Sequence, residues 1–238
     1  MLDAVLEQIP PAKTRTSNSI RIVAVADTHL YHKRLVVPPG DIFVHAGDMC
    51  GNGPYHELRV AAEWIMSLPH RHKVIIAGNH DWAFVNHAKE ARELFKDATY
   101  LQDSETTIEG LRFYGAPWQP RFFDWAFNLE RGKQLAYVWR KIPLGIDVLI
   151  THGPPAGFGD ICFDGRRAGC EDLLERVKVV KPRLHLYGHI HDDGGAWITP
   201  QTSFVNVTTS ECRRAPTVID YEPEHNRFTF IHVPPNKK

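Results

Sequence analysis

The chain has 238 residues, of which 43% are hydrophobic and 24% are charged, as is usual for a globular protein in water. Its 28 Lys and Arg residues balance its 28 Asp and Glu residues, so the net charge gives no reason to expect a nucleic-acid polymer or a membrane as partner. His is unusually frequent, with 14 residues, which suits a metal enzyme.

The cysteines and the N-terminus indicate the cellular compartment. The four Cys residues are scattered and form no CxxC pair, so a thiolate zinc site is not expected and free thiols are. Residues 1–19 are polar and lack the apolar stretch of a signal peptide, and no apolar run is long enough to span a membrane. We therefore predict a cytoplasmic protein. The sequon Asn206-Val207-Thr208 is then a coincidence.

The predicted elements alternate between strands and helices in the first part of the chain. After a leader over residues 1–19, with a short helix over 2–9, we predict a strand over 20–26, a strand over 41–46, a helix over 57–68, a strand over 73–77 and a helix over 87–95. Short strands follow within 100–114, with a turn at 109–110, and then a helix over 129–140.

The later part of the chain is richer in strands. We predict a strand over 147–150, a helix over 170–180 that Pro182 ends, and strands over 184–187, 196–198, 203–207, 217–221 and 227–233. This order predicts an α/β domain over residues 20–238 with a mixed sheet, or two sheets, flanked by helices.

A polar cluster directly follows each of five buried strands. The clusters are Asp27-x-His29, Gly47-Asp48, Gly78-Asn79-His80-Asp81, Thr151-His152-Gly153 and Gly188-His189-x-His191. In open α/β sheets, ligands bind beyond the carboxyl ends of the strands, so we expect the clusters to converge on one site. Taken singly, each cluster also fits an ordinary turn, a helix cap or a surface His, and only their joint occurrence favours a functional site.

The side chains of the clusters predict a site for two metal ions. They offer seven Asp, Asn and His ligands, which is too many for one tetrahedral zinc ion. Two ions about 3.5–4 Å apart that share a bridging carboxylate would use them all. Nitrogen and oxygen ligands without thiolate suit manganese, iron, zinc or cobalt. In the third cluster, His80 can donate a proton to a leaving group, and Asp81 can hold the other ring nitrogen of that His.

The order of these motifs resembles that of the calcineurin-like metallophosphoesterase superfamily over residues 20–207. The segments Tyr55-His56-Glu57-Leu58, Gly169-Cys170 and Phe204-Val205-Asn206 resemble its metallophosphoesterase-domain branch. The resemblance implies a calcineurin-like phosphoesterase sandwich of two central mixed β-sheets flanked by helices.

The resemblance also implies the role of each site residue. One metal ion would be held by Asp27, His29, Asp48 and His191, and the other by Asp48, Asn79, His152 and His189, with Asp48 as the bridge. Asn79 and His80 would contact the phosphate, and His80 with Asp81 would serve catalysis. Some members of the branch carry Gly in place of the first His of the last motif and lose activity, whereas this chain has His189.

These observations predict a binuclear phosphoesterase, with manganese as the expected metal. The resemblance to the branch implies hydrolysis of small phosphodiesters such as cyclic nucleotides, and we expect attack by a metal-bridging hydroxide. The alternatives are a phosphomonoesterase, a nuclease that uses a local basic patch of Arg166, Arg167, Lys178 and Lys181, and a non-catalytic scaffold on the same fold. The glycine-rich segment 153–169 is expected to overhang the metals and shape specificity.

Overall fold

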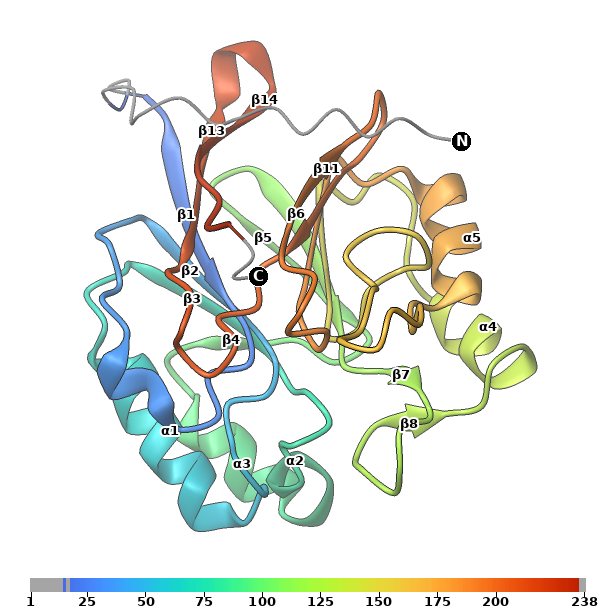
Figure 1. Ribbon diagram of the computed structural model, residues 1–238. Coiled ribbons are helices and arrows are strands. Elements are labelled where there is room, and N and C mark those ends of the chain that lie inside the picture. The colour runs from blue at the N-terminus through green and yellow to red at the C-terminus, as the bar shows by residue number, and fades with distance from the viewer. Residues whose placement is uncertain (1–14, 16–17, 236–238) are drawn as a thin grey trace.

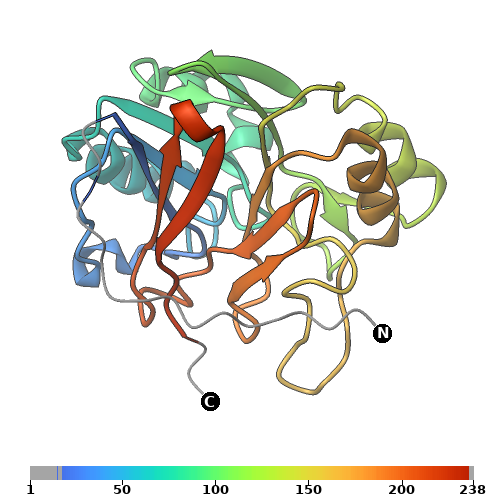
Figure 2. The same cartoon turned by 90° about the horizontal axis from the view of Figure 1, so that it is seen from above.

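A computed structural model describes residues 15 and 18–235 of the chain. Two six-stranded sheets lie face to face, with helices on both outer sides (Figure 1). Seen from above, the helices lie at the two sides of the molecule with the sheets between them (Figure 2). The prediction of two central mixed sheets flanked by helices is therefore confirmed. The short helix predicted over residues 2–9 lies outside the described residues.

The first sheet has the strand order β14-β13-β1-β2-β3-β4. Its strands are β1 (Ile20–Val25), β2 (Ile42–Ala46), β3 (His72–Ile76), β4 (Thr99–Tyr100), β13 (Thr217–Glu222) and β14 (Arg227–His232). The strands β1 to β4 run parallel, whereas β13 pairs antiparallel with β1. The helices α1 (Tyr55–Ser67), α2 (Ala83–Asn86) and α3 (Ala88–Leu94) cover its outer face.

The second sheet has the strand order β11-β12-β10-β9-β6-β5. Its strands are β5 (Ser104–Ile108), β6 (Leu111–Ala116), β9 (Val148–Thr151), β10 (Leu184–Tyr187), β11 (Gly195–Ile198) and β12 (Ser203–Asn206). The four inner strands are parallel, and both edge strands are antiparallel to their neighbours. The helices α4 (Lys133–Trp139) and α5 (Glu171–Val180) cover its outer face.

Alternation along the strands builds three hydrophobic layers. In β1, Ile22 and Ala24 point into the core between the sheets, whereas Val23 and Val25 pack beneath the helices. The inner core also contains Phe113, from the second sheet. In β1, β2, β3, β9 and β10, every residue after the first two is buried, on one face of the sheet or the other. These strands are therefore nearly continuous apolar runs in the sequence.

Five short elements were not predicted. They are the helix α2, the strand pair β7 (Gln119–Pro120) and β8 (Asn128–Leu129), and the 3-10 helices η1 (Tyr31–Arg34) and η2 (Pro223–His225). Each has only two to four residues, too few to show a periodic pattern. Among the described residues, no helix is both long and apolar enough to cross a bilayer.

The strand ends position the site. The parallel strands β1, β2 and β3 of one sheet and β9 and β10 of the other end at the same edge of the sandwich, so the five polar clusters lie together there.

Candidate metal centre

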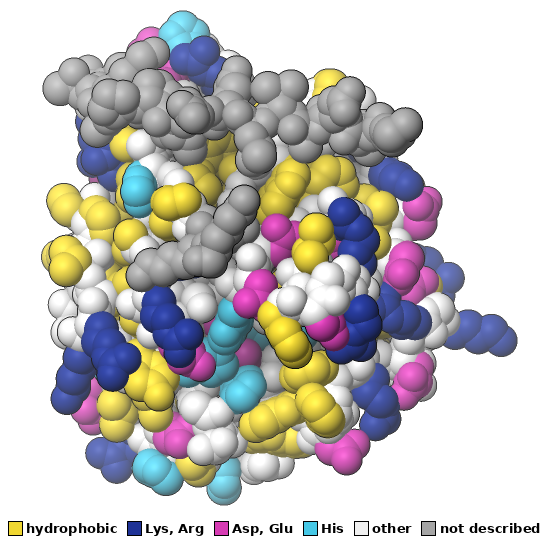
Figure 3. Space-filling view, viewed as in Figure 1, with side chains coloured by type: hydrophobic (Ala, Val, Ile, Leu, Met, Phe, Trp, Pro, Cys, Tyr) yellow, Lys and Arg dark blue, Asp and Glu magenta, His cyan; other side chains and the backbone are white. Residues whose placement is uncertain are grey.

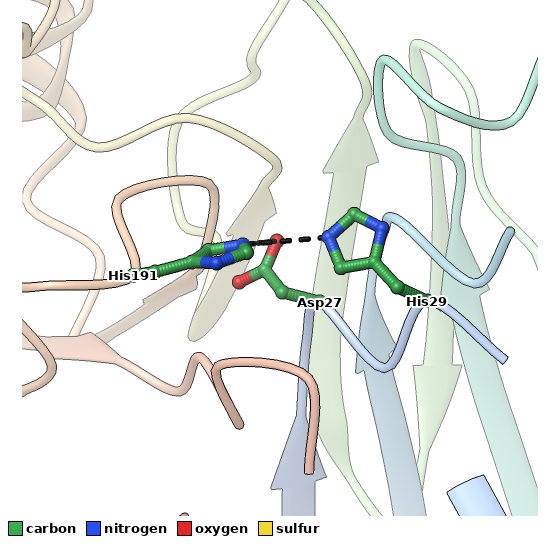
Figure 4. Close-up of side chains that lie close together, drawn as sticks. All are labelled: Asp27, His29 and His191. Atoms are coloured by element: carbon green, nitrogen blue, oxygen red, sulfur yellow. Dashed lines mark hydrogen bonds and ion pairs between the residues drawn. The ribbon is translucent and has the colours of Figure 1, made fainter. Parts of the chain in front are cut away.

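Asp27, His29 and His191 form the first group of potential metal ligands (Figure 4). The Nε2 atoms of His29 and His191 lie 3.4 Å apart, and Nε2 of His191 is 3.8 Å from Oδ1 of Asp27. Asp27 is fully buried, and its carboxylate also accepts the backbone N–H of His189 at 3.0 Å. Residues from the loop after β1 and from the loop after β10, 162 positions apart, thus meet around one point.

His152, His189 and Asp48 form the second group. The rings of the two His residues have centroids 5.1 Å apart. Asn79 joins them, because its Oδ1 atom lies 3.0 Å from Nε2 of His152. With the first group, the structure brings together all seven side chains that the sequence suggested as metal ligands.

Asp48 lies between the two groups. Its Oδ2 atom is 3.3 Å from Nε2 of His152 and 3.8 Å from Nε2 of His29. Its Oδ1 atom accepts the backbone N–H of His80 at 2.8 Å. A single carboxylate oxygen therefore faces one His of each group, which is the position that a bridging ligand requires.

The hydrogen bonds of the His rings fit the binding of cations. Nδ1 of His29 lies 2.9 Å from the carbonyl oxygen of Cys50, and Nδ1 of His152 lies 2.9 Å from that of Ala46. Because a carbonyl oxygen can only accept, each Nδ1 carries a proton, and Nε2 is the ring atom that faces the site and can bind a cation in place of a proton.

Nε2 of His152 faces two oxygen acceptors of the second group. It lies 3.0 Å from the amide oxygen of Asn79 and 3.3 Å from Oδ2 of Asp48. Acceptors at such distances repel one another unless a proton or a metal ion lies between them. The residues therefore fit a pair of metal ions held by nitrogen and oxygen ligands.

The charges of the site point the same way. Burial opposes the ionisation of Asp48, yet His152 and His29 lower its pKa well below the ordinary value. Burial likewise opposes the protonation of His152, but Asp48 raises its pKa to about 9. For Asp27, the opposing effect of burial is again outweighed, here by His191, and its pKa is lowered. Two buried carboxylates are thus kept ionised and attract positive charge to this point.

The backbone is strained where it presents the ligands. Asp27, His29, Asp48 and His189 all have positive φ angles, of 56°, 42°, 58° and 69°. Non-glycine residues rarely adopt this conformation, and it is found where the surrounding structure imposes it at functional sites.

The glycines of the motifs make room for the ligands. A Cβ atom on Gly78 would lie 2.3 Å from Oδ1 of Asp48, and one on Gly188 would lie 2.5 Å from Oδ2 of Asp27. Both distances are too short for non-bonded atoms, so the backbone of one strand end approaches the carboxylate of another only because these residues lack side chains.

The role predicted for Asp81 in holding the His80 ring is wrong. The Asp81 carboxylate is fully buried and accepts backbone N–H groups from four residues, at 2.8–3.0 Å: Asp48, Met49, Cys50 and Gly78. Burial and the charge of Asp48 raise the pKa of Asp81 to about 6, while these donors lower it. Asp81 therefore fixes the turn that carries Asp48, since the chain direction after β3 aims its side chain under that turn rather than at the neighbouring ring.

The ring of His80 is held by other groups. Its Nδ1 atom pairs with the carbonyl oxygen of Gly51. One side of the ring stacks on Trp125, with centroids 4.0 Å apart, and its centroid is 4.6 Å from that of His29. With Nδ1 occupied by a carbonyl, Nε2 is the ring atom left to face a substrate.

Asn206 is a site residue that the sequence did not reveal. Its side-chain NH₂ group donates to the carbonyl oxygens of Gly159, Ile190 and Asp193, and its oxygen accepts the N–H of Thr208. It thereby holds the loop that carries His189 and His191. Its signals in the sequence were the sequon and the branch-like segment Phe204-Val205-Asn206, neither of which indicated this role, and Asn206 is completely buried, as its hydrogen bonds require.

Two further buried His residues form hydrogen bonds with Thr residues that adjoin candidate ligands. Nε2 of His45 lies 3.0 Å from the hydroxyl of Thr28, and Nε2 of His185 lies 2.8 Å from that of Thr151. Each Thr immediately precedes a candidate ligand, His29 or His152. Burial lowers the pKa of both His45 and His185 to about 3, so they are neutral near pH 7.

The segment 153–169 is fixed beside the site by polar contacts. Asp160 is buried and pairs with Arg167, and the N–H of Ile161 donates to the Asp193 side chain at 3.0 Å. These contacts lead to the loop after His191 rather than to the ligands themselves, so an influence on specificity stays a prediction.

The sequence and the fold of the chain match known proteins. Residues 20–193 match the family model described as calcineurin-like phosphoesterase. The human protein named metallophosphoesterase domain-containing protein 1 is 36% identical, over 93% of this chain and 77% of its own length. A Caenorhabditis elegans protein, UPF0046 protein C25E10.12, is also 36% identical, over 85% of this chain and 80% of its own length.

Solved structures share the fold at low sequence identity. One structure that is 17% identical superposes with a TM-score of 0.67, over 89% of this chain and 98% of its own. GAP50 of Plasmodium, described as the anchor in the inner membrane complex, superposes with a TM-score of 0.53 at 11% identity, over 93% of this chain and 90% of its own. By its sequence match and its two-sheet fold, this chain belongs to the calcineurin-like phosphoesterase family of metallophosphoesterases.

Proposed function

We propose that the protein is a phosphodiesterase that hydrolyses small phosphodiesters, such as cyclic nucleotides, with two divalent transition-metal ions, manganese foremost. The observation that carries the proposal is the position of the Asp48 carboxylate between His29 and His152, within a complete set of seven ligand side chains. A scaffold that has lost catalysis has no need to keep every ligand and the strained backbone that presents four of them.

Different residues of the chain would hold the metal ions, bind the phosphate and protonate the leaving group. When bound, two divalent ions supply Lewis acidity and neutralise charge that develops on the phosphoryl oxygens. Asp27, His29, Asp48 and His191 would hold one ion, and Asp48, Asn79, His152 and His189 the other. His80 would bind the phosphate with Asn79, and Nε2 of His80 would give a proton to the departing alkoxide.

A small diester suits the surroundings of the site better than a nucleic-acid polymer. The residues considered as a basic patch are mostly neutralised, because Arg166 pairs with Asp164, Arg167 with Asp160 and Lys178 with Glu175. The rings of Phe122 and Trp125 lie against His189 and His80, and offer a second ester substituent an apolar surface. A monoester has no such substituent.

The test is a substrate panel on protein that has been freed of metal and re-supplied with manganese, zinc, iron or magnesium. We expect bis(p-nitrophenyl) phosphate and cyclic nucleotides to be hydrolysed faster than p-nitrophenyl phosphate, with the highest rate in manganese. Hydrolysis of the monoester alone would replace the proposal with a phosphomonoesterase. Two bound metal ions without turnover of any ester would indicate a scaffold.

A further inference from the structure

The loop between β7 and β8 brings aromatic rings to the edge of the metal centre. We call Phe122–Trp125 the aromatic loop. The ring of Phe122 approaches that of His189 edge to face, with centroids 5.6 Å apart and an interplanar angle of 87°. Trp125 stacks on His80 at 4.0 Å. One short loop thus contacts a ligand of the second group on one side and the proposed proton donor on the other.

The loop is held in a fixed conformation. The side chain of Asn128 donates to the carbonyl oxygens of Phe122 and Phe123, at 3.1 and 3.0 Å. The N–H of Ala126 donates to the carbonyl oxygen of Asn79, which ties the loop to a ligand strand. Phe123 has a φ of 47°, a costly conformation for a bulky side chain that persists only where the surroundings impose it. The aromatic surface is therefore formed before a substrate arrives.

Two of these rings are open to solvent. Phe122 is 46% exposed and Phe123 is 73% exposed. A single exposed apolar side chain needs no explanation, but here exposed rings adjoin a cluster of polar ligands. In the space-filling view, His side chains lie at the centre of one face beside a hydrophobic area (Figure 3). An apolar wall beside convergent polar groups is the usual composition of a small-molecule site.

We propose that the aromatic loop binds a planar aromatic ring on the retained ester substituent of the substrate, with Phe122 as the residue that selects it. The inference rests on the proposed function, since it needs an ester with a substituent besides the leaving group. His80 marks the side of the leaving group, because it is the proposed proton donor. The retained substituent then lies on the side of His189, where the Phe122 ring stands. Aromatic rings prefer such edge-to-face or offset partners.

The test compares two diesters that share a leaving group. Methyl p-nitrophenyl phosphate and phenyl p-nitrophenyl phosphate both release p-nitrophenolate, so only the retained substituent differs. The ratio of the two kcat/KM values is compared between the wild type and each variant. The difference in intrinsic reactivity between the two diesters then cancels. We expect Phe122→Ala to lower kcat/KM for the phenyl diester roughly 10-fold and to change that for the methyl diester less than about 2-fold.

Matched variants separate the ring from general effects. Phe122→Tyr keeps a ring at the position and should keep the preference for the phenyl diester. Tyr137→Ala removes a ring that is 61% exposed on α4, on the outer face of the second sheet. It should leave kcat/KM unchanged for both diesters. An equal loss for both diesters in Phe122→Ala, or an unchanged ratio, would overturn the inference.

A binding measurement keeps the inference independent of turnover. Phenylphosphonate and methylphosphonate are titrated by calorimetry into the manganese-loaded protein and the same variants. We expect tighter binding of the phenyl compound, by roughly 10-fold, and loss of that preference in Phe122→Ala. If diesters are not hydrolysed but this preference is found, the proposed function fails and the aromatic site stands. If diesters are hydrolysed but neither assay shows the preference, the aromatic site fails alone.

Discussion

The carboxylate of Asp81 accepts the backbone N–H of Asp48 at 2.9 Å, so one buried carboxylate holds the turn that presents another. The turn is strained, with a φ of 58° at Asp48, and needs such support. Each Asp81 oxygen accepts two N–H groups: Oδ2 those of Asp48 and Gly78, and Oδ1 those of Met49 and Cys50. Asp81 is therefore a residue that positions the proposed bridging ligand.

The first prediction follows from this arrangement. In Asp81→Asn, one of the two oxygens becomes an NH₂ group that faces two N–H donors, whichever way the amide turns. We expect the free energy of unfolding to fall by about 2–4 kcal/mol and manganese to bind more weakly. Denaturant unfolding and calorimetric titration measure the two effects. The exposed Asp97→Asn is the control, and wild-type behaviour of Asp81→Asn would refute the role.

The second prediction concerns the proton donor. His80→Ala should lower turnover by about 10²–10⁴-fold while the metal content stays near that of the wild type. Diesters with poor alkoxide leaving groups need the proton and should lose most, whereas those that release p-nitrophenolate should lose less. Steady-state kinetics over a leaving-group series, with elemental analysis of each sample, tests both statements. An equal loss across the series would leave His80 as a phosphate-binding group, and the loss of a metal ion would make it a ligand.

The third prediction concerns the loop that carries His189 and His191. Asn206→Ala removes the donor for three carbonyl groups, of which those of Gly159 and Ile190 are buried, and should destabilise the fold by about 1–3 kcal/mol for each buried group left without a partner. Asn206→Asp is nearly the same size but turns a carboxylate oxygen toward those carbonyls. We expect it to be the more damaging of the two, both in thermal unfolding and in manganese affinity. A milder effect of Asp than of Ala would contradict this reading of the hydrogen bonds.

The fourth prediction is a pH dependence of stability at His185. Burial lowers its pKa to about 3 in the folded protein, whereas a His in the unfolded chain titrates near 6.5. The unfolded chain therefore binds the extra proton between these values. The contribution of His185 to stability is complete above about pH 6.5 and is lost as the pH falls, by up to about 1.4 kcal/mol per pH unit.

Replacement of His185 by Gln should remove this slope. We expect the free energy of unfolding of His185→Gln to depend less steeply on pH than that of the wild type between about pH 6.5 and 5. Denaturant unfolding at a series of pH values provides the comparison, and His56→Gln, on the exposed side of α1, is the control for loss of a His. Equal slopes for the wild type and His185→Gln would show that the buried ring is protonated without cost.

The sequence predicted most of the strands and the polar clusters that follow them because both depend on local patterns. Apolar runs such as 20–26 end where the chain leaves the core, and the polar residues that follow lie at the strand ends in the structure. Contacts between distant segments could not be predicted in this way. Asp81 was assigned to its neighbour His80, whereas three of its four donors lie in residues 48–50, more than 30 positions away.

The aromatic loop shows the same limit. Phe122 and His189 are far apart in the sequence, and no motif links them, but β7 and β8 place their rings in contact. The short strands that form this loop have no periodic pattern that could have revealed it. Asn206 is similar, because its side-chain NH₂ group acts through three carbonyl groups that only the fold brings to it.

The fifth prediction tests the central claim, that Asp48 bridges a pair of metal ions. The measurement is the number of manganese ions bound per chain, by calorimetry and elemental analysis, in the wild type, in Asp48→Ala and in the exposed control Asp97→Ala. The account predicts about two ions in the wild type and in the control, and fewer than about one in Asp48→Ala, because that change removes a ligand from both positions. A wild-type protein that binds no ions, or an Asp48→Ala variant that keeps two tightly bound ions with full turnover, would contradict it.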